Sequence, residues 1–162
     1  MIRGLFFWQP VNFGFVPILF FFSHWFLWLL VFGLLGYFLL KKKYRQLFWF
    51  LIILAVSEIV EVIGKRFSPW PRPFYTNGSV PPNWFAGYSH GSFPSGHGMR
   101  SVILLYFLWV ENKKLFWFLL PGVILADVGR VLFGLHYPID IIGGLIFGLA
   151  IVCTSRKIKN AD

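Results

Sequence analysis

The chain contains few acidic residues and almost no cysteine. Only 6 of its 162 residues are Asp or Glu, against 15 Lys and Arg, and Cys occurs once, as Cys153. A lone Cys excludes an intramolecular disulfide framework. Charged residues make up 13% of the chain, where an ordinary soluble domain has roughly 25%. The composition therefore argues against a water-soluble globular protein.

Apolar residues dominate what is present. They account for 57% of the sequence, aromatic residues account for 22%, and the mean hydropathy is +0.69. A chain of this length is expected to form one domain, residues 1–162, whose core could not hide so much apolar surface from water. We therefore expect an integral membrane protein, in which lipid surrounds the helices.

Long apolar runs indicate the membrane-spanning segments, each of which needs about 20 residues. We predict an all-α transmembrane bundle with five spans, at residues 17–40, 47–64, 95–110, 115–135 and 138–154. Residues 1–16 are apolar but contain polar positions and join the first span without a polar loop, so an interfacial helix is expected there. A six-span alternative folds residues 4–40 as a hairpin.

The basic residues predict the orientation. The first, third and fifth spans are each followed by a basic cluster; the clusters are Lys41 to Lys43 with Arg45, Lys113 with Lys114, and Arg156 with Lys157 and Lys159. With an odd number of spans the three clusters share one side, which the positive-inside rule assigns to the cytoplasm. The formal charge of +9 is thus explained without nucleic acid, for which no recognised motif is present.

Three polar clusters fall on the opposite, outer side. In the first, Lys65 at the end of the second span is followed by Arg72, which lies between Pro71 and Pro73. The prolines favour an extended backbone, and Arg and Lys are the side chains that bind phosphate. Taken alone, this cluster is more often a snorkelling Lys beside a stiff loop. Residues 65–94 are expected to form an outer-face loop of the active site.

The second cluster lies where the third span begins. Pro94 precedes Ser95, Gly96 and His97. Free backbone N–H groups at a helix start, a hydroxyl and a small residue make a site for an anion, although the same pattern alone is a common helix cap. The cluster gains meaning from the other two.

The third cluster surrounds the start of the fifth span. Pro138 suits the first helical position, so that Asp140 falls in the first turn and His136 just before it. A carboxylate at that distance fixes the tautomer of an imidazole and makes its other nitrogen a better nucleophile or base. Arg130, near the end of the fourth span, is expected to face the same pocket.

The order of these residues resembles the three-part signature of the type 2 phosphatidic acid phosphatase superfamily, which also includes vanadium haloperoxidases. The matching residues run from 65 to 140: Lys65, Arg72 and Pro73, then Pro94 to His97, then Arg130, His136 and Asp140. In one departure, Gly129 stands where the family usually has a Ser that donates a hydrogen bond to phosphate. One donor would then be missing or supplied by backbone.

The resemblance implies a lipid phosphatase that needs no metal and no cofactor. His136 would attack phosphorus and form a phosphohistidine, Asp140 would orient it, and His97 would protonate the leaving oxygen and then activate water. The phosphate-binding residues implied by the family are Lys65, Arg72, Ser95, Gly96 and Arg130.

Other polar residues of the spans are expected to support the site or the fold. Glu61 lies four residues before Lys65, the favourable order for a helical ion pair, and is expected to position that Lys. Asp127 lies three residues before Arg130 and is expected to hold its guanidinium. Gly144 and Gly148 form a G-x-x-x-G step, more often used for packing inside a bundle than for dimerisation.

The expected enzyme acts on a membrane lipid at the outer leaflet of a bacterial-type inner membrane. By the resemblance, lipid A 1-phosphate and undecaprenyl diphosphate are the favoured substrates, and phosphatidylglycerophosphate is the third. Lipid-to-lipid phosphotransfer and a non-catalytic scaffold that binds anionic lipid remain alternatives. Residues 74–93 would recognise the headgroup. The sequence leaves the oligomeric state open.

Overall fold

The computed structural model describes residues 16–68, 70–76 and 91–159, and every regular element within them is a helix. In chain order the elements are α1 (Val16–Phe21), the π-helix η1 (Phe22–Phe26), α2 (Leu27–Leu40), α3 (Tyr44–Phe67), α4 (Pro73–Thr76), α5 (Gly96–Glu111), α6 (Lys113–Leu132) and α7 (Pro138–Lys159). The all-α prediction is confirmed.

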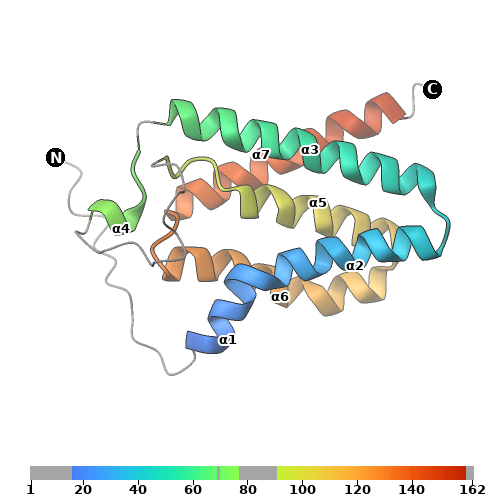
Figure 1. Ribbon diagram of the computed structural model, residues 1–162, viewed down its shortest axis with the longest axis horizontal. Coiled ribbons are helices and arrows are strands. Elements are labelled where there is room, and N and C mark those ends of the chain that lie inside the picture. The colour runs from blue at the N-terminus through green and yellow to red at the C-terminus, as the bar shows by residue number, and fades with distance from the viewer. Residues whose placement is uncertain (1–15, 69, 77–90, 160–162) are drawn as a thin grey trace.

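The long helices form an up-and-down bundle. Figure 1 shows α2, α3, α5, α6 and α7 running alternately in opposite directions along the long axis of the molecule. The segment α1, η1 and α2 is one continuous helical run that bends where the π-turn interrupts it, as expected for this irregularity. Residues 16–40 therefore contain no reversal of the kind that the six-span hairpin requires within them.

Among the residues that the structure describes, four helices are long and apolar enough to cross a membrane: Pro17–Leu40, Tyr44–Phe67, Lys113–Leu132 and Pro138–Arg156. The remaining predicted span, the third (residues 95–110), corresponds to α5, whose 16 residues rise only about 24 Å, less than the roughly 30 Å hydrocarbon core. It nevertheless connects the two ends of the bundle in Figure 1. Because the other helices surround it, α5 does not need to meet lipid along its whole length.

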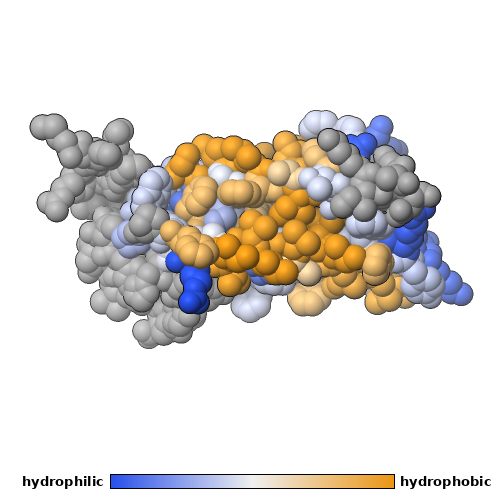
Figure 2. Space-filling view, turned by 90° about the horizontal axis from the view of Figure 1, so that it is seen from above, coloured by the Kyte–Doolittle hydropathy of each residue, from blue (hydrophilic) through white to orange (hydrophobic). Residues whose placement is uncertain are grey.

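The surface agrees with a membrane environment. Large apolar side chains face outward on the spanning helices, for example Phe32 (64% exposed), Val62 (65%) and Phe118 (79%). Figure 2 shows hydrophobic residues across the middle of the molecule, a smaller hydrophilic group toward its left end and a larger hydrophilic group at its right end. The α2–α3 and α5–α6 connections and the end of α7 lie at that end in Figure 1, so the three basic clusters share one side.

α5 forms the centre of the core. Its Ile103, Leu104 and Phe107 belong to a buried cluster with residues of α2, α3, α6 and α7. The Phe107 ring makes edge contacts with Phe38 and Phe50, at centroid distances of 5.8 and 5.0 Å. Burial of these rings fixes α5 against α2 and α3, and thereby fixes the start of α5 at the other end of the bundle.

Small residues let α5 and α7 approach each other closely. A Cβ on Gly148 would lie 2.8 Å from the Met99 backbone oxygen, and a Cβ on Gly144 would collide with the Ser95 backbone. The G-x-x-x-G step therefore packs inside the bundle, as predicted.

Several boundaries differ from the predictions. α3 and α7 extend a few residues beyond the predicted spans, and α6 ends at Leu132 instead of residue 135. The polypeptide is extended at Pro71, which forms an isolated bridge with Gly91, but a short helix starts at Pro73. All but the last residue of the interfacial helix predicted for residues 1–16, and most of the predicted headgroup loop, residues 77–90, lie outside the described residues.

Candidate active site

The three polar clusters meet at the end of the bundle opposite the basic clusters. Backbone hydrogen bonds join them: the Ser95 amide donates to the Asp140 carbonyl (3.0 Å), and the Phe74 amide donates to the Gly134 carbonyl (3.2 Å). The first link ties the start of α5 to the start of α7, and the second ties the loop after α3 to the turn after α6. Segments far apart in sequence thus form one site.

His136 lies between a carboxylate and a guanidinium. Its Nδ1 is 3.5 Å from Oδ2 of Asp140, and its Nε2 is 3.4 Å from Nη1 of Arg72. All three side chains are buried, with exposed fractions of 2% for His136, 0% for Asp140 and 1% for Arg72. One ring nitrogen therefore faces the group that can stabilise imidazolium, while the other faces a group that can bind phosphate.

The local sequence explains how His136 is placed. Gly134 has φ = +66°, a conformation that Gly adopts without strain, and its amide bonds to the Val131 carbonyl, so α6 stops there. α7 then starts at Pro138, and Oδ2 of Asp140 accepts a 2.8 Å hydrogen bond from the Tyr137 amide. The same carboxylate thus closes the helix start and reaches His136.

Arg72 is held in the same turn. Its Nη1 donates a 2.9 Å hydrogen bond to the Leu135 carbonyl. The Ser92 amide donates a 3.0 Å hydrogen bond to the Trp70 carbonyl, which ties the segment that carries Arg72 to the segment before α5. Ser92 is buried and lies beside His136 and Asp140. The first and third clusters are thereby in direct contact.

The surroundings of His136 favour its neutral form. Burial has the largest effect, followed by the positive charges of Arg72, Arg130 and Lys65, and together they hold the pKa of His136 well below its ordinary value. At neutral pH the imidazole therefore carries a lone pair. A neutral imidazole beside fixed cations is suited to nucleophilic attack on an anionic phosphate.

The second cluster begins α5 as predicted. Ser95 is the N-cap, and its hydroxyl accepts a hydrogen bond from the Gly98 amide at 3.4 Å. His97 follows in the first turn with 8% of its surface exposed, and its Nε2 has no hydrogen-bond partner among the described residues. It lies within electrostatic range of His136 and Arg130. A buried imidazole with an unused nitrogen is available for proton transfer.

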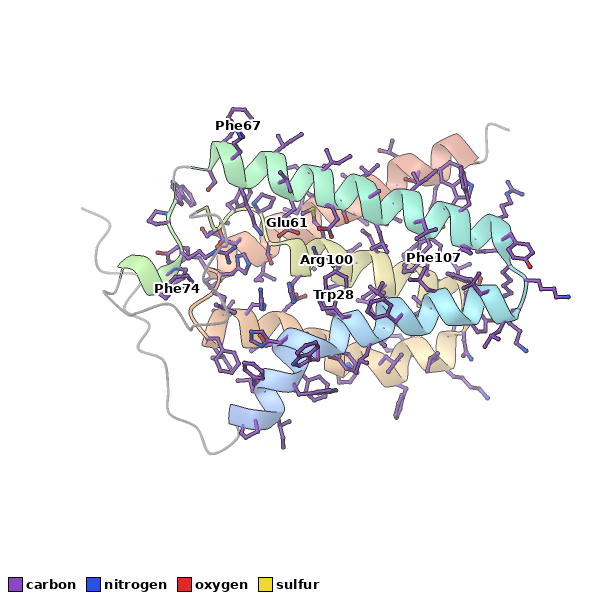
Figure 3. The ribbon with its side chains drawn as sticks, in the orientation of Figure 1. Trp28, Glu61, Phe67, Phe74, Arg100 and Phe107 are labelled. Carbon is purple, nitrogen blue, oxygen red and sulfur yellow. The ribbon has the colours of Figure 1, made fainter. Side chains whose placement is uncertain are left out.

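Lys65 belongs to a charge network between α3 and α5. Glu61 pairs with Lys65 through one oxygen, and its other oxygen accepts a 2.9 Å hydrogen bond from Nη2 of Arg100. Arg100 also donates from Nε to Glu58 (2.8 Å) and lies 5.1 Å from the Trp28 ring. Figure 3 shows Glu61, Arg100 and Trp28 together between the helices. The Glu61–Lys65 pair was predicted, whereas the part played by Arg100 was not.

Gly96 makes room for this network. A Cβ at position 96 would overlap the Glu61 carboxylate. The carboxylate therefore lies directly against the first turn of α5, where the positive end of the helix dipole stabilises a negative charge.

Arg130 is buried at 6% exposure near the end of α6. Its Nη1 donates a 3.4 Å hydrogen bond to the backbone oxygen of Ser23, in the π-turn of the first span. Asp127 lies beside Ser101 and within electrostatic range of Arg130. The predicted role of Asp127 as a support for Arg130 remains a prediction.

The sequence prediction missed three polar residues at this end of the bundle. Arg100 was visible only as a basic residue close to the second cluster. Ser92 precedes that cluster by two positions, and Ser23 is one of two adjacent polar residues in an apolar span; the other, His24, has its Nδ1 3.0 Å from the Phe20 carbonyl oxygen. A polar residue in a long apolar run was the available signal for Ser23.

Within the described residues there is no group of three or more His, Cys, Asp and Glu side chains that could hold a metal ion. The groups around His136 are cations and the imidazole of His97, and the nearby carboxylates are engaged with them: Asp140 lies beside His136, and Glu61 pairs with Lys65. Such a set suits an anionic ligand.

Comparisons with known proteins point the same way. The model of the PAP2 superfamily matches residues 46–161. The chain is 27% identical over 139 residues to the bacitracin transport permease protein BcrC of Bacillus licheniformis, an alignment that covers 82% of this chain and 66% of that protein. It is 33% identical over 109 residues to the putative undecaprenyl-diphosphatase YbjG of Escherichia coli, covering 66% and 53%.

A third relative is phosphatidylglycerophosphatase B of Bacillus subtilis, 30% identical over 120 residues, with 65% of this chain and 56% of that protein covered. The chain thus spans between about half and two thirds of the length of these relatives. No solved structure matches. The four long apolar helices make this a multi-pass membrane protein. Because the family model covers most of the chain, the protein belongs to the PAP2 superfamily.

Proposed function

We propose that this protein is a membrane lipid phosphatase that works through a phosphohistidine at His136. The observation that carries the proposal is the position of His136 between Asp140 at Nδ1 (3.5 Å) and Arg72 at Nε2 (3.4 Å). A phosphate held by Arg72 would place its phosphorus next to the attacking nitrogen. Membership of the PAP2 superfamily supports this reaction class.

In the first step, Nε2 of His136 forms a bond to phosphorus while the bond from phosphorus to the leaving oxygen breaks. Asp140 offsets the positive charge that develops on the ring. The negative charge of the bound phosphate offsets the cations around His97, so that His97 carries a proton in the complex and gives it to the leaving oxygen. Lys65, Arg72 and Arg130, with the Ser95–Gly96 turn, hold the phosphoryl oxygens and stabilise the charge in the transition state.

In the second step, water replaces the histidine. His97, now neutral, takes a proton from water as the water oxygen bonds to phosphorus and the N–P bond breaks. Inorganic phosphate leaves, and His136 regains its lone pair. The balance of the two steps needs water alone as co-reactant, and no step uses a metal ion.

Undecaprenyl diphosphate is the substrate that we favour. Two considerations support it: a relative named as a putative undecaprenyl-diphosphatase aligns with two thirds of the chain, and the cationic site suits a terminal phosphate of high negative charge. Phosphatidylglycerophosphate is the second candidate, because another relative is named phosphatidylglycerophosphatase B. Lipid A 1-phosphate offers the same kind of phosphate group and belongs in the same test.

We place the reaction at the outer leaflet of the inner membrane. The three basic clusters and the site lie at opposite ends of the bundle (Figure 1), and the positive-inside rule puts basic clusters in the cytoplasm. The site would then face the periplasm and receive lipid from the outer leaflet.

The experiment is phosphate release by the purified full chain in detergent. The panel contains undecaprenyl diphosphate, phosphatidylglycerophosphate, lipid A and phosphatidic acid, each tested with wild type, His136→Ala and the control Ser57→Ala. Ser57 is a buried hydroxyl in α3 that bonds its own helix, at 2.7 Å from the Leu54 oxygen. We expect release from undecaprenyl diphosphate by wild type and Ser57→Ala, and none by His136→Ala. Equal release by His136→Ala would contradict the mechanism.

Two additions to the assay test the alternatives. A chelator should leave the rate unchanged, whereas loss of activity that only a divalent metal restores would contradict a reaction without metal. An added acceptor lipid should not become phosphorylated. If it does, the phosphohistidine passes its phosphate to lipid, and the protein is a phosphotransferase.

A further inference from the structure

The hydroxyl of Ser23 is buried in the first span without a hydrogen-bond partner. Ser23 is 0% exposed, and its Oγ bonds to none of the described residues. A serine inside a helix can bond to a carbonyl of the preceding turn. Ser57 and Ser155 of this chain do so, at 2.7 and 2.8 Å. A buried hydroxyl without such a bond is costly unless it serves a ligand or water.

The π-turn is what gives Ser23 this position. Ser23 lies in η1, where the backbone departs from regular α-helix spacing. π-turns occur mostly as single bulges and often at functional sites, because the extra residue changes the direction of the side chains. η1 packs against α6 of the active site, with Gly122 directly beneath the Phe26 ring.

Gly129 supplies the space that Ser23 occupies. A Cβ at position 129 would lie 2.9 Å from the Cβ of Ser23, closer than two such atoms approach in proteins. Any residue larger than Gly at 129 would therefore push Ser23 aside. The side chain beside Arg130 on this face comes from the first span and not from α6.

Ser23 is also bound to a residue of the site. Its backbone oxygen accepts the 3.4 Å hydrogen bond from Nη1 of Arg130. The hydroxyl therefore belongs to the residue that contacts the Arg130 guanidinium. We propose that this guanidinium binds the phosphoryl oxygens. His24, the next residue, lies within electrostatic range of both Arg130 and His97.

We propose that Ser23 is a phosphate-binding residue of this active site. Its hydroxyl donates a hydrogen bond to a phosphoryl oxygen held by Arg130, from a helix that lies outside the part of the chain matched by the family model, residues 46–161. The inference rests on the proposed function, since it takes the ligand at Arg130 to be a phosphoryl group. It adds a binding residue that none of the three sequence clusters contains.

The test compares Ser23→Ala with wild type and with Ser57→Ala. A hydrogen bond to a charged group predicts that Ser23→Ala lowers kcat/KM by about 10- to 100-fold, while Ser57→Ala stays at the wild-type value. Thermal unfolding in detergent shows whether each variant is folded. Wild-type kcat/KM in folded Ser23→Ala would overturn the proposal.

A swap of the hydroxyl separates binding from packing. Ser23→Gly removes the hydroxyl and clears the space at position 129, and Ser23→Gly combined with Gly129→Ser returns a hydroxyl from α6. We expect the first to lose activity and the double variant to regain most of it. If the double variant is folded but stays as inactive as Ser23→Gly, the hydroxyl is not what the site requires, and the proposal fails.

Orthovanadate binding separates this proposal from the proposed function, because vanadate resembles the phosphoryl group without the lipid. Stabilisation of wild type by vanadate, reduced at least tenfold in apparent affinity in Ser23→Ala, supports the role of Ser23 even if no lipid of the panel is hydrolysed. Equal vanadate affinity in both proteins overturns it even if wild type is an active phosphatase. Absence of vanadate binding to wild type contradicts both.

Discussion

Arg100 on α5 donates a 2.9 Å hydrogen bond to Glu61 on α3, and the other oxygen of that carboxylate pairs with Lys65. The Glu61 side chain is 12% exposed and that of Arg100 is 9% exposed, so the contact is largely shielded from lipid and water. Arg100 therefore acts on the site through Glu61: it neutralises part of the carboxylate and fixes the place from which Lys65 reaches the phosphate.

We predict that Arg100→Gln lowers kcat/KM about tenfold and destabilises the fold by about 2 kcal/mol, because the buried Glu61 carboxylate loses one of its two cationic partners. Arg100→Lys keeps the positive charge and should retain more of both. The matched control is Lys114→Gln, which changes an exposed basic residue at the other end of the bundle. Kinetics and thermal unfolding in detergent check the result, and wild-type values for Arg100→Gln would show that Lys65 needs no such support.

Gly96→Ala tests the position of the Glu61 carboxylate. The added Cβ would overlap that carboxylate and push it away from Lys65. A displacement of about 1 Å at a catalytic site costs on the order of 100-fold in rate, which is the loss we expect in kcat/KM. Gly36→Ala, in α2, has no atom within 4 Å of the new Cβ and should keep full activity. Equal activity in the two variants would refute this role of Gly96.

Asp140→Asn tests the support of His136. The Asn oxygen can still accept the hydrogen bond from the Tyr137 amide, so the start of α7 should be kept. The charge that stabilises the ring during attack is lost, and kcat should fall by on the order of 10⁴-fold, as for comparable Asp–His pairs. Single-turnover kinetics check the chemical step. A loss confined to KM would mean that Asp140 serves substrate binding instead.

The surroundings of His136 predict the pH range in which its side chain is neutral. The charged and titratable groups facing it come from every neighbouring segment; they are Lys65, Arg72, His97, Arg130 and Asp140. Burial and the cations lower its pKa, so His136 should stay neutral as the pH falls to 6.5 and become protonated only below that value. NMR of labelled histidine, assigned with His136→Ala, measures this directly, and a pKa at or above 6.5 would contradict it.

Much of the fold was predictable because lipid imposes a simple rule. Apolar runs of about 20 residues form helices, and the predicted spans agree with the helices to within a few residues. The ends were less predictable: α6 ends at Leu132, two residues before Gly134, whose left-handed conformation lies in the turn that leads to His136. The short length of α5 reflects its central position, which its own sequence does not reveal.

The candidate site was predictable where it depends on short spacings, such as Asp140 four residues after His136 or Lys65 four residues after Glu61. Contacts between helices were not predictable. Nothing in the sequence near Arg130 indicates Ser23, more than 100 positions earlier, because a π-turn and a glycine bring the two together. Arg100 was missed for the same reason, since its partner lies 39 positions away.

The central proposal is that phosphate passes through His136, and trapping the intermediate tests it most directly. Wild type, His136→Gln and His97→Ala are mixed with undecaprenyl diphosphate labelled in its terminal phosphate, stopped in alkaline detergent and analysed for protein-bound label. We predict label on His136 that is stable in base and lost in acid, absent from His136→Gln and longer-lived in His97→Ala. Turnover by wild type with no bound label, or with label on another residue, would contradict the mechanism.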